Sequence, residues 1–404
     1  MTDLFETAVQ AAQPSQCLPP FLKPFAGHAG RCIVIGAGKA SAAMAEAVEA
    51  HWPGRLEGLV ITRHGYARPT KSIEIVEADH PVPGAAGVAA TRRMLKLVSG
   101  LGPDDLVICL LSGGGSALLT LPADGISLAA KQALTAALLA SGAPIGAMNT
   151  VRKHISAIKG GRLAAACRPA SLLSLAISDV AGDDLSVIAS GPTVPDASTC
   201  ADALAVLEHY GIEAPQEILK ALNETPKPGD ADFAGDDAII IADARRALTA
   251  AAARARAVGL EPVILGPALE GEARDMAAEM AAGLDSYSAR PLVLLSGGEA
   301  TVTLKGDGKG GPNTEFLLAL ALALDGRAEV CAIACDTDGI DGSEDNAGAY
   351  IGPDTLARAR ALGLDGAAML ANNDAHGFFA PLGDLIVTGP TYTNVNDFRA
   401  ILLS

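Results

Sequence analysis

The sequence is poor in aromatic residues, which make up 3% of the chain and include a single Trp. Because aromatic side chains favour β-structure, their scarcity beside 44 Gly disfavours a β-sandwich and predicts an α/β fold with Ala-rich helices. Only 19% of the residues are charged while half are apolar, which disfavours extended disorder. A chain of 404 residues also exceeds the usual size of one hydrophobic core, so about two to three domains are expected.

Positive charge is scarce as well: 30 basic against 46 acidic residues give a net charge of −16. Such a chain repels nucleic acid and anionic lipid, so neither is an expected partner, and an anionic substrate would need a locally positive pocket. The seven cysteines include no C-x-x-C pair, and their odd number argues against a disulfide framework. Since neither a signal peptide nor an apolar run of about 18 residues occurs, the expected compartment is the cytoplasm.

Apolar runs that lead into amphipathic, Ala-rich stretches recur along the first half of the chain. This alternation predicts a doubly wound parallel sheet. The expected strands are 32–35, 59–62, 73–76, 106–111 and 172–177, and the expected helices are 41–52, 85–98 and 128–141.

The Pro-rich, polar stretch 210–237 is the best linker, and it predicts an N-terminal domain over 1–230 and a smaller domain over 231–404. The second half predicts a mixed sheet. Its expected strands are 238–242, 262–265, 292–295, 300–304, 330–334 and a final one at 385–388. The strands 292–295 and 300–304 would be joined by a tight turn, a hairpin or a bulged bend. The expected helices end at 257, begin at 270 and span 315–324.

Two glycine-rich turns follow predicted strands. Gly36-Ala37-Gly38-Lys39 and Ser112-Gly113-Gly114-Gly115-Ser116 each join a strand to a helix, where backbone N–H groups can bind phosphate or carboxylate. Neither turn carries the complete dinucleotide fingerprint or the P-loop ending, and a turn that only permits helix packing is the alternative.

The densest basic segment of this acidic chain lies at 152–162. Arg152, Lys159 and Arg162 would share one helix face if a helix ran through. A solvated charged face is the alternative interpretation.

Carboxylates follow predicted strands in both halves, as Asp179, Asp183 and Asp184 in the first and Asp336, Asp338 and Asp341 in the second. Oxygen ligands of this kind suit Mg²⁺, although Asp is also a common turn former. The second group lacks the Glu of an EF-hand, since Ala347 stands there. The loops at 309–315, with Asn313 and Glu315, and at 388–397 could line a cleft or simply cap helices.

Together these motifs resemble the glycerate 2-kinase family, whose members are often labelled hydroxypyruvate reductases. The resemblance rests on G-A-G-K-A at 36–40, D-H-P-V-P at 79–83, S-G-G-G-S-A at 112–117, N-T-V-R-K-H to K-G-G-R-L at 149–163, S-D-V-x-G-D-D at 178–184, S-G-P-T at 190–193, D-T-D-G-I-D-G-S at 336–343 and G-P-T-x-T-N-V-N-D at 389–397. It implies a Rossmann-like domain and a smaller α/β MOFRL domain, with the active site in the cleft between them. It also implies ATP- and Mg²⁺-dependent phosphorylation of D-glycerate at its 2-hydroxyl.

The resemblance gives Lys39 as the functional lysine. From residue type we assign Lys39, Asp179 and Arg152 to catalysis. Phosphate or carboxylate binding falls to Gly36, Gly38, Ser112, Gly113, Gly114, Gly115, Ser116, Lys159, Asn313 and Glu315, and magnesium binding to Asp183, Asp184, Asp336, Asp338 and Asp341.

One position departs from the family, which usually has G-G-R-N where this chain has Gly310-Gly311-Pro312-Asn313. Either Arg152 or Lys309 supplies the missing charge, or the substrate is a related sugar acid. Two further functions stay open: an NAD(P)H-dependent hydroxypyruvate reductase and a sugar-acid sensor without turnover. A homodimer stays open as the oligomeric state.

Overall fold

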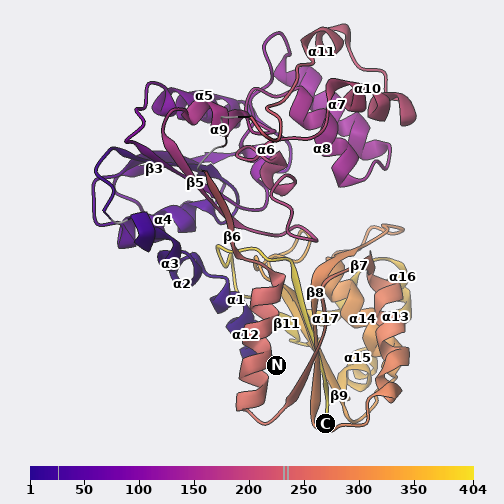
Figure 1. Cartoon of the computed structure of the whole chain (residues 1–404). Coiled ribbons are helices and arrows are strands. Elements are labelled where there is room, and N and C mark those ends of the chain that lie inside the picture. Colours follow the sequence, from indigo (N-terminus) through magenta and orange to yellow (C-terminus); the bar gives the residue numbers. More distant parts are fainter. Residues whose placement is uncertain (26, 231–232, 234–235) are drawn as a thin grey trace. The chain divides into compact units, whose positions relative to one another are not determined.

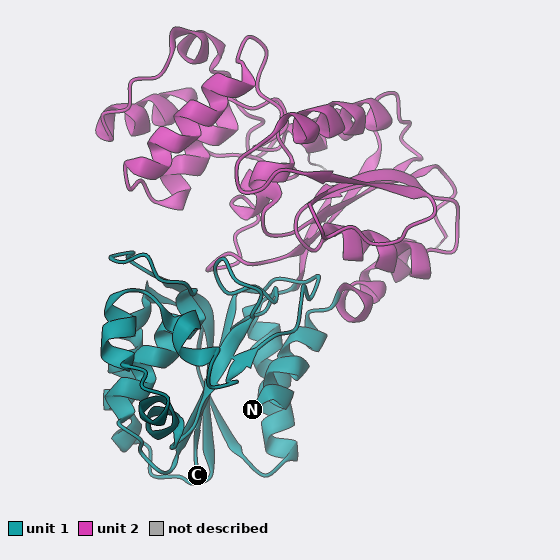
Figure 2. Cartoon of the chain, turned by 180° about the vertical axis from the view of Figure 1, so that it is seen from behind, with its two compact units in different colours: residues 1–13, 242–404 teal, residues 14–241 magenta. Residues whose placement is uncertain are grey.

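The computed structural model describes residues 1–25, 27–230, 233 and 236–404, and these divide into two compact units. Unit 2 comprises residues 14–241, and unit 1 comprises residues 1–13 together with 242–404 (Figure 2). The sequence-based boundary between residues 230 and 231 borders residues 231–232, which lie outside the described part of the chain, and it stays a prediction. The first helix belongs with the C-terminal half, because Phe5 stacks on Phe398 at 5.9 Å and Asp3 pairs with Arg254 at 2.6 Å.

Unit 2 is built on a sheet of order β3-β2-β1-β4-β5-β6, the order of dinucleotide-binding folds (Figure 1). The pairs β3/β2, β2/β1, β1/β4 and β4/β5 are parallel, with Gly36 opposite Leu110 at the centre. The strands are β1 Cys32–Ala37, β2 Glu57–Arg63, β3 Ile73–Ala78, β4 Leu106–Leu111, β5 Ser171–Ile177 and β6 Asp237–Ala242. The predicted α/β class and the doubly wound sheet are confirmed.

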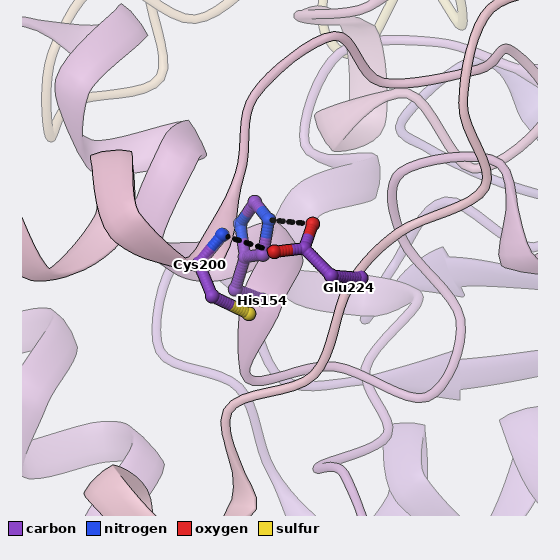
Figure 3. Close-up of side chains that lie close together, drawn as sticks. All are labelled: His154, Cys200 and Glu224. Atoms are coloured by element: carbon purple, nitrogen blue, oxygen red, sulfur yellow. Dashed lines mark hydrogen bonds and ion pairs between the residues drawn. The ribbon is translucent and has the colours of Figure 1, made fainter.

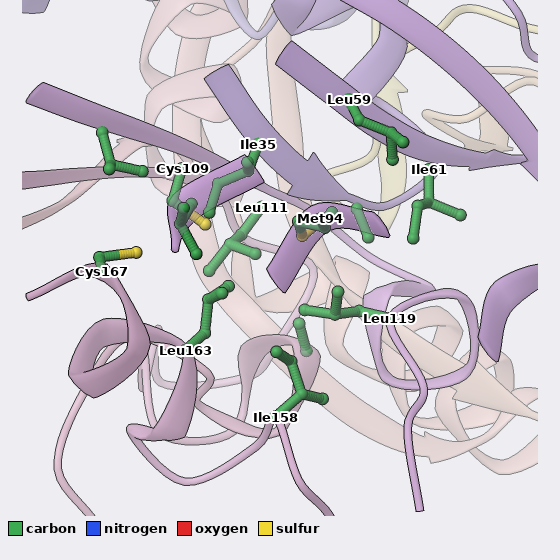
Figure 4. Close-up of a cluster of buried hydrophobic side chains, with 14 of the residues drawn as sticks. Ile35, Leu59, Ile61, Met94, Cys109, Leu111, Leu119, Ile158, Leu163 and Cys167 are labelled. Carbon is green, nitrogen blue, oxygen red and sulfur yellow. The ribbon is translucent and has the colours of Figure 1, made fainter. Parts of the chain in front are cut away.

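The helices of unit 2 cover the sheet and form a separate cluster beside it. α4 packs on one face of the sheet, whereas α5 and α9 bury Met94, Leu163 and Cys167 against the other (Figure 4). α7, α8, α10 and α11 share their own apolar core around Leu134 and Val151. The bounds are α2 Pro14–Cys17, α3 Pro19–Leu22, α4 Ser41–His51, α5 Ala85–Val98, α6 Gly115–Leu118, α7 Leu128–Ala140, α8 Ile145–His154, α9 Arg162–Cys167, α10 Cys200–His209 and α11 Gln216–Ala221, with 3₁₀ turns at Lys23–Phe25 and Ile188–Ser190.

Unit 1 contains the predicted mixed sheet, of order β11-β10-β9-β12-β8-β7. β7 and β8 are parallel, and the other pairs are antiparallel. The strands are β7 Glu261–Glu272, β8 Leu292–Thr301, β9 Val330–Asp336, β10 Gly348–Ile351, β11 Leu385–Ile386 and β12 Asp397–Leu403; the helices are α1 Thr2–Ala11, α12 Ala244–Ala257, α13 Ala273–Gly283, α14 Pro312–Leu324, α15 Thr355–Ala361, α16 Gly366–Ala371 and α17 Ala375–Phe379, with a 3₁₀ turn at Leu284–Ser286.

Two expectations for unit 1 were wrong, and a third was displaced. Residues 292–304 do not form two strands joined by a turn, because β8 runs unbroken through Gly297-Gly298 and the irregularity lies on β7 at Gly266. The helix expected to begin at Glu270 is present as α13 but begins at Ala273, since Glu270–Glu272 still pair with Glu299–Thr301. The last strand is β12 rather than 385–388.

The described part of the Pro-rich stretch, residues 210–230, 233 and 236–237, belongs to unit 2. Ile212 and Leu222 pack against the α7/α8/α10/α11 cluster. The Thr225 hydroxyl donates to Asp196 at 3.1 Å. The described residues of this segment therefore pack against the rest of unit 2, although their composition is typical of a linker.

Candidate active site

The turns after β1 and β4 interlock where the strand order of the unit 2 sheet reverses. The N–H of Lys39 donates to the Gly113 carbonyl at 2.8 Å, and the N–H of Ala40 donates to Ser112 Oγ at 3.0 Å. A Cβ on Gly38 would lie 2.1 Å from that Oγ, and a Cβ on Gly36 would lie 2.1 Å from the Leu110 carbonyl oxygen. Only glycine permits this approach, and the Ser112 hydroxyl holds the Lys39 turn against β4.

Three side chains from different strand ends surround the triple glycine. Asp179, which follows β5, lies so close to Gly113 that a Cβ there would be 1.8 Å from its Oδ2. A Cβ on Gly114 would lie 3.0 Å from His80 Nε2 and 3.4 Å from Lys39 Cγ. The structure therefore brings the predicted Lys39 and Asp179 to one glycine turn, in the crevice where doubly wound sheets bind their ligands. It adds His80, which belongs to the D-H-P-V-P motif but was given no role.

A small cavity opens beside this turn. Its volume is about 140 Å³, and ten residues line it: His80, Pro81, Pro83, Gly114, Ser116, Ala117, Lys131, Thr135, Arg152 and Lys159. Three of these side chains are cations, and none is a carboxylate. In this acidic protein, such a lining favours an anionic ligand.

Two of the cavity's three cations, Lys131 and Lys159, are deeply buried. Lys131 is 2% exposed, and its Nζ has no hydrogen-bond partner within the described part of the chain. Burial, reinforced by the Arg152 charge, lowers the pKa of Lys131 to about 7. Burial also lowers the pKa of Lys159 well below its usual value, and the nearby Lys131 and Arg152 add to this effect.

The predicted common helix face of Arg152, Lys159 and Arg162 was wrong, because α8 ends at His154. Arg152 and Lys159 nevertheless meet at the cavity. Arg162 does not line it: its guanidinium donates to the Lys153 carbonyl at 2.7 Å and also binds Asn223. Arg162 thus stabilises the chain around the end of α8.

A row of hydrogen bonds supports the cavity wall. Ser116 Oγ lies 2.9 Å from Ser190 Oγ, which donates to Asn149 Oδ1 at 3.1 Å, and Lys159 Nζ donates to the Ala189 carbonyl at 3.2 Å. Ala189 and Ser190 have φ values of +52° and +63°. Such backbone conformations in non-glycine residues are costly and cluster at functional sites.

The predicted metal ligands of unit 2 lie in the loop after β5. Asp183 is half-buried with a φ of +57°, and Asp184 is exposed and accepts the Ser186 N–H at 2.8 Å. Their assignment to magnesium stays a prediction.

In unit 1, Asp341 caps α14. Its carboxylate accepts the N–H groups of Asn313 and Thr314 at 2.9 and 2.8 Å, and also the Thr314 hydroxyl at 2.8 Å. Burial raises the pKa of Asp341 to about 6. These bonds occupy both carboxylate oxygens, which leaves Asp341 poorly suited to bind magnesium.

The other predicted residues of unit 1 have internal partners. Asn313 Nδ2 donates to Asp397 at 2.6 Å, and Glu315 accepts from Arg274 at 2.6 Å and from Asn373. Asp336 accepts the Asp338 N–H at 2.8 Å, and Asp338 in turn accepts the Ile340 N–H at 2.9 Å. These contacts shape the loops around the start of α14, and the predicted ligand roles stay predictions.

Within residues 1–25, 27–230, 233 and 236–404, one trio of side chains with metal-ligating atoms is mutually close, and none of its members was predicted as a ligand. His154, Cys200 and Glu224 offer atoms within 4.8 Å of one another (Figure 3). His154 Nδ1 contacts the Thr150 carbonyl at 2.8 Å, and its Nε2 lies 3.8 Å from Glu224. Lys227 Nζ lies 2.8 Å from the same carboxylate and, with its hydrogen bond as the largest cause, lowers the pKa of Glu224 to about 2. An ammonium already neutralises Glu224, so the trio needs no metal.

Within the described residues, no helix is both long enough and apolar enough to cross a bilayer.

Comparisons with known proteins cover nearly the whole chain. Residues 1–223 match a domain of unknown function, DUF4147, and residues 292–397 match the MOFRL family. A D-glycerate 2-kinase of Thermotoga maritima is 40% identical over 404 residues, which cover 98% of this chain and 95% of that protein. A putative hydroxypyruvate reductase of Agrobacterium vitis is 53% identical over 414 residues, covering 99% and 93% of the two chains. The crystal structure of the Thermotoga maritima glycerate kinase matches with a TM-score of 0.92 at 39% identity, and covers 100% of this chain and 98% of that chain.

The contact between Gly113 and Asp179 predicts that Gly113→Ala is destabilising. Because the new Cβ would lie 1.8 Å from Asp179 Oδ2, the carboxylate or the turn must move. We expect the free energy of unfolding to fall by about 1–3 kcal/mol, measured by urea denaturation. Gly146→Ala is the control, since a Cβ there meets nothing within 4 Å. A Gly113→Ala variant as stable as this control would contradict the contact.

The capping role of Asp341 predicts that Asp341→Ala costs about 3 kcal/mol, because two buried N–H groups and a hydroxyl lose their acceptor. Thermal denaturation without added metal measures this loss. Asp365→Ala removes an exposed N-cap from α16 and should cost about 1 kcal/mol. A smaller loss for Asp341→Ala than for Asp365→Ala would refute the capping role.

Proposed function

This chain belongs to the glycerate kinase family, and we propose that it transfers the γ-phosphoryl group of ATP to the 2-hydroxyl of D-glycerate, with Mg²⁺ as the metal. One observation carries the proposal. Lys39 and Asp179 border a single triple-glycine turn where the order of a 3-2-1-4-5-6 sheet reverses, and a cavity lined by cations adjoins that turn. Sheets of this kind bind their ligands at this place.

Phosphoryl transfer asks the protein mainly to position two anions and to stabilise charge. In the proposed reaction the 2-hydroxyl oxygen of D-glycerate attacks the γ-phosphorus, the bond to the β,γ-bridging oxygen breaks, and ADP leaves. We assign Asp179 as the base that takes the hydroxyl proton, and Lys39 as the cation that faces the phosphoryl oxygens. The N–H groups of the Gly113–Gly115 turn would hold phosphate.

Magnesium prefers oxygen ligands and usually binds through one or two carboxylates together with substrate phosphates. Asp183 and Asp184 fit this chemistry as carboxylates in the loop after β5, and we retain them as its ligands. Asp336 and Asp338 stay candidates in unit 1, whereas the bonds that Asp341 makes to α14 argue against it. Bound Mg²⁺ would neutralise charge on the β- and γ-phosphates.

The proline that replaces the family's usual arginine suits its position. Pro312 is the first residue of α14, where a missing N–H costs nothing and the fixed φ favours a helix. Of the two cations proposed as substitutes, Lys309 is an exposed residue, 3.4 Å from Glu344. Arg152 lines the cationic cavity. We therefore propose that Arg152 supplies the positive charge near the substrate.

A hydroxypyruvate reductase is the second candidate, because a relative that is 53% identical carries that name. In NAD-dependent sheets of this order, an acidic residue at the end of the second strand binds the ribose. Here β2 ends at Arg63. An arginine there would suit the 2′-phosphate of NADP better than the ribose hydroxyl of NAD, so the assay below includes NADPH.

We expect the purified protein to release ADP with Mg²⁺, ATP and D-glycerate, at a rate on the order of 1–100 s⁻¹. A coupled assay measures ADP, and phosphorus NMR distinguishes 2-phosphoglycerate from the 3-isomer. Hydroxypyruvate with NADH or NADPH is the parallel reaction. Oxidation of either cofactor without ADP release would establish the reductase, and 3-phosphoglycerate as the product would overturn the assigned position.

Replacing Lys39 tests its place in the reaction. Lys39→Ala should lower kcat/KM by about 100- to 1,000-fold, because it removes a full charge from the developing phosphoryl group. Lys96→Ala changes an exposed lysine of α5 in the same unit and should leave the rate unchanged. Circular dichroism checks folding. A Lys39→Ala enzyme that keeps most of its rate would remove this lysine from the mechanism.

A further inference from the structure

The cationic cavity of unit 2 is unusual because it contains positive charge without a matching anion. Among its ten lining residues, Lys131, Arg152 and Lys159 are cations, and no carboxylate is present. Lys131 Nζ has no hydrogen-bond partner among the described residues, and Lys159 Nζ has only the Ala189 carbonyl. Burying charge in this way destabilises a fold unless a counter-ion compensates. A ligand that carries negative charge is therefore the natural occupant.

The size of the cavity limits that ligand. About 140 Å³ lies below the range of about 300–1,000 Å³ typical of pockets that hold drug-sized molecules. A space of this volume suits the carboxylate end of a three- or four-carbon acid better than a nucleotide base with its ribose. A phosphate group is the other oxyanion of suitable size.

The position of the cavity favours the acid over the nucleotide. Gly114 lines the cavity, and the same residue lies against His80 and Lys39. Asp179 contacts the neighbouring Gly113. An acid whose carboxylate lies among the cations would therefore direct its 2-hydroxyl toward the residues that we assign to phosphoryl transfer.

We propose that this cavity binds the carboxylate of the hydroxyacid substrate, with Lys131 as its central cation. The sequence motifs give Lys131 no role. The assignment rests on the proposed function for the identity of the acid, but not for the presence of an anion site. Arg152 and Lys159 flank the carboxylate, and Ser116 offers a hydroxyl at the same wall.

Binding at this site should be coupled to protonation. With a pKa of about 7, the Lys131 amine is mostly neutral at pH 8, and a bound carboxylate would raise that pKa and charge the amine. The other titratable groups that face the cavity are His80, Arg152 and Lys159. The acid should therefore take up about one proton through Lys131 when it binds at pH 8.

Lys131→Met tests the assignment, with Lys96→Met as the control on an exposed face. We expect the KM for D-glycerate to rise by about 10- to 100-fold and the KM for ATP to stay within about twofold. The melting temperature without ligand should stay the same or rise, because a buried amine without a hydrogen-bond partner among the described residues is removed. A raised KM for ATP instead would assign the cavity to phosphate. An unchanged KM with a lowered melting temperature would make Lys131 structural. Either result overturns the proposal.

Binding calorimetry distinguishes a failure of the proposed kinase function from a failure of the cavity assignment. If the wild-type protein has no kinase activity with D-glycerate, the proposed function fails, while the cavity can still be tested with a panel of three- and four-carbon hydroxyacids. An acid that binds the wild type and the Lys96→Met variant, but not Lys131→Met, supports the cavity assignment. If no acid binds, or if inorganic phosphate alone binds, the assignment is overturned.

Calorimetry in buffers of different ionisation enthalpy at pH 8 measures the proton uptake. Lys131→Arg should keep binding but take up about one proton less, since a guanidinium does not titrate there. Equal uptake by the wild type and Lys131→Arg would contradict the charging of Lys131.

Discussion

The close approach of two turns at the centre of the unit 2 sheet is the constraint on which the candidate site depends. Gly36 lies against the backbone of Leu110, and Gly38 lies against the hydroxyl and backbone of Ser112. Neither position has room for a methyl group. This contact fixes the Lys39 turn relative to the triple glycine after β4. Because Asp179 and His80 also pack on those glycines, the ends of β1, β3 and β5 all meet at the turn after β4.

Much of unit 2 could be predicted from the sequence because its pattern is local. Apolar runs such as Leu106–Leu111 coincide with strands, and glycine turns follow them, so the parallel sheet and the place of Lys39 could be inferred. Unit 1 was harder. β8 contains Gly297-Gly298, which is typical of a turn. β12 contains Asp397 and Arg399, whose charges are not expected in a buried strand. In the structure these two side chains form a buried ion pair with each other.

The residues of the cavity show a different limit of sequence analysis. Arg152 and Lys159 were selected from a basic segment on the basis of a shared helix face that does not exist. Lys131 was missed because a lone lysine in an amphipathic helix resembles any solvated charge. Its 2% exposure and the lack of a carboxylate in the lining depend on α7, α8 and the 80–83 loop packing together. No local motif encodes that packing.

The packing of α1 on unit 1 affects the order in which the nascent chain can fold. Unit 2 is continuous and is complete once residue 241 has been synthesised, so it can fold while the ribosome is still translating. α1 cannot, since Phe5 and its apolar neighbours pack on α12 and β12, and β12 ends at Leu403. Among the described helices, α1 is thus one of the last to be buried, although it precedes all of unit 2 in the sequence. Its apolar face therefore stays exposed until α12 and β12 have been synthesised and packed against it.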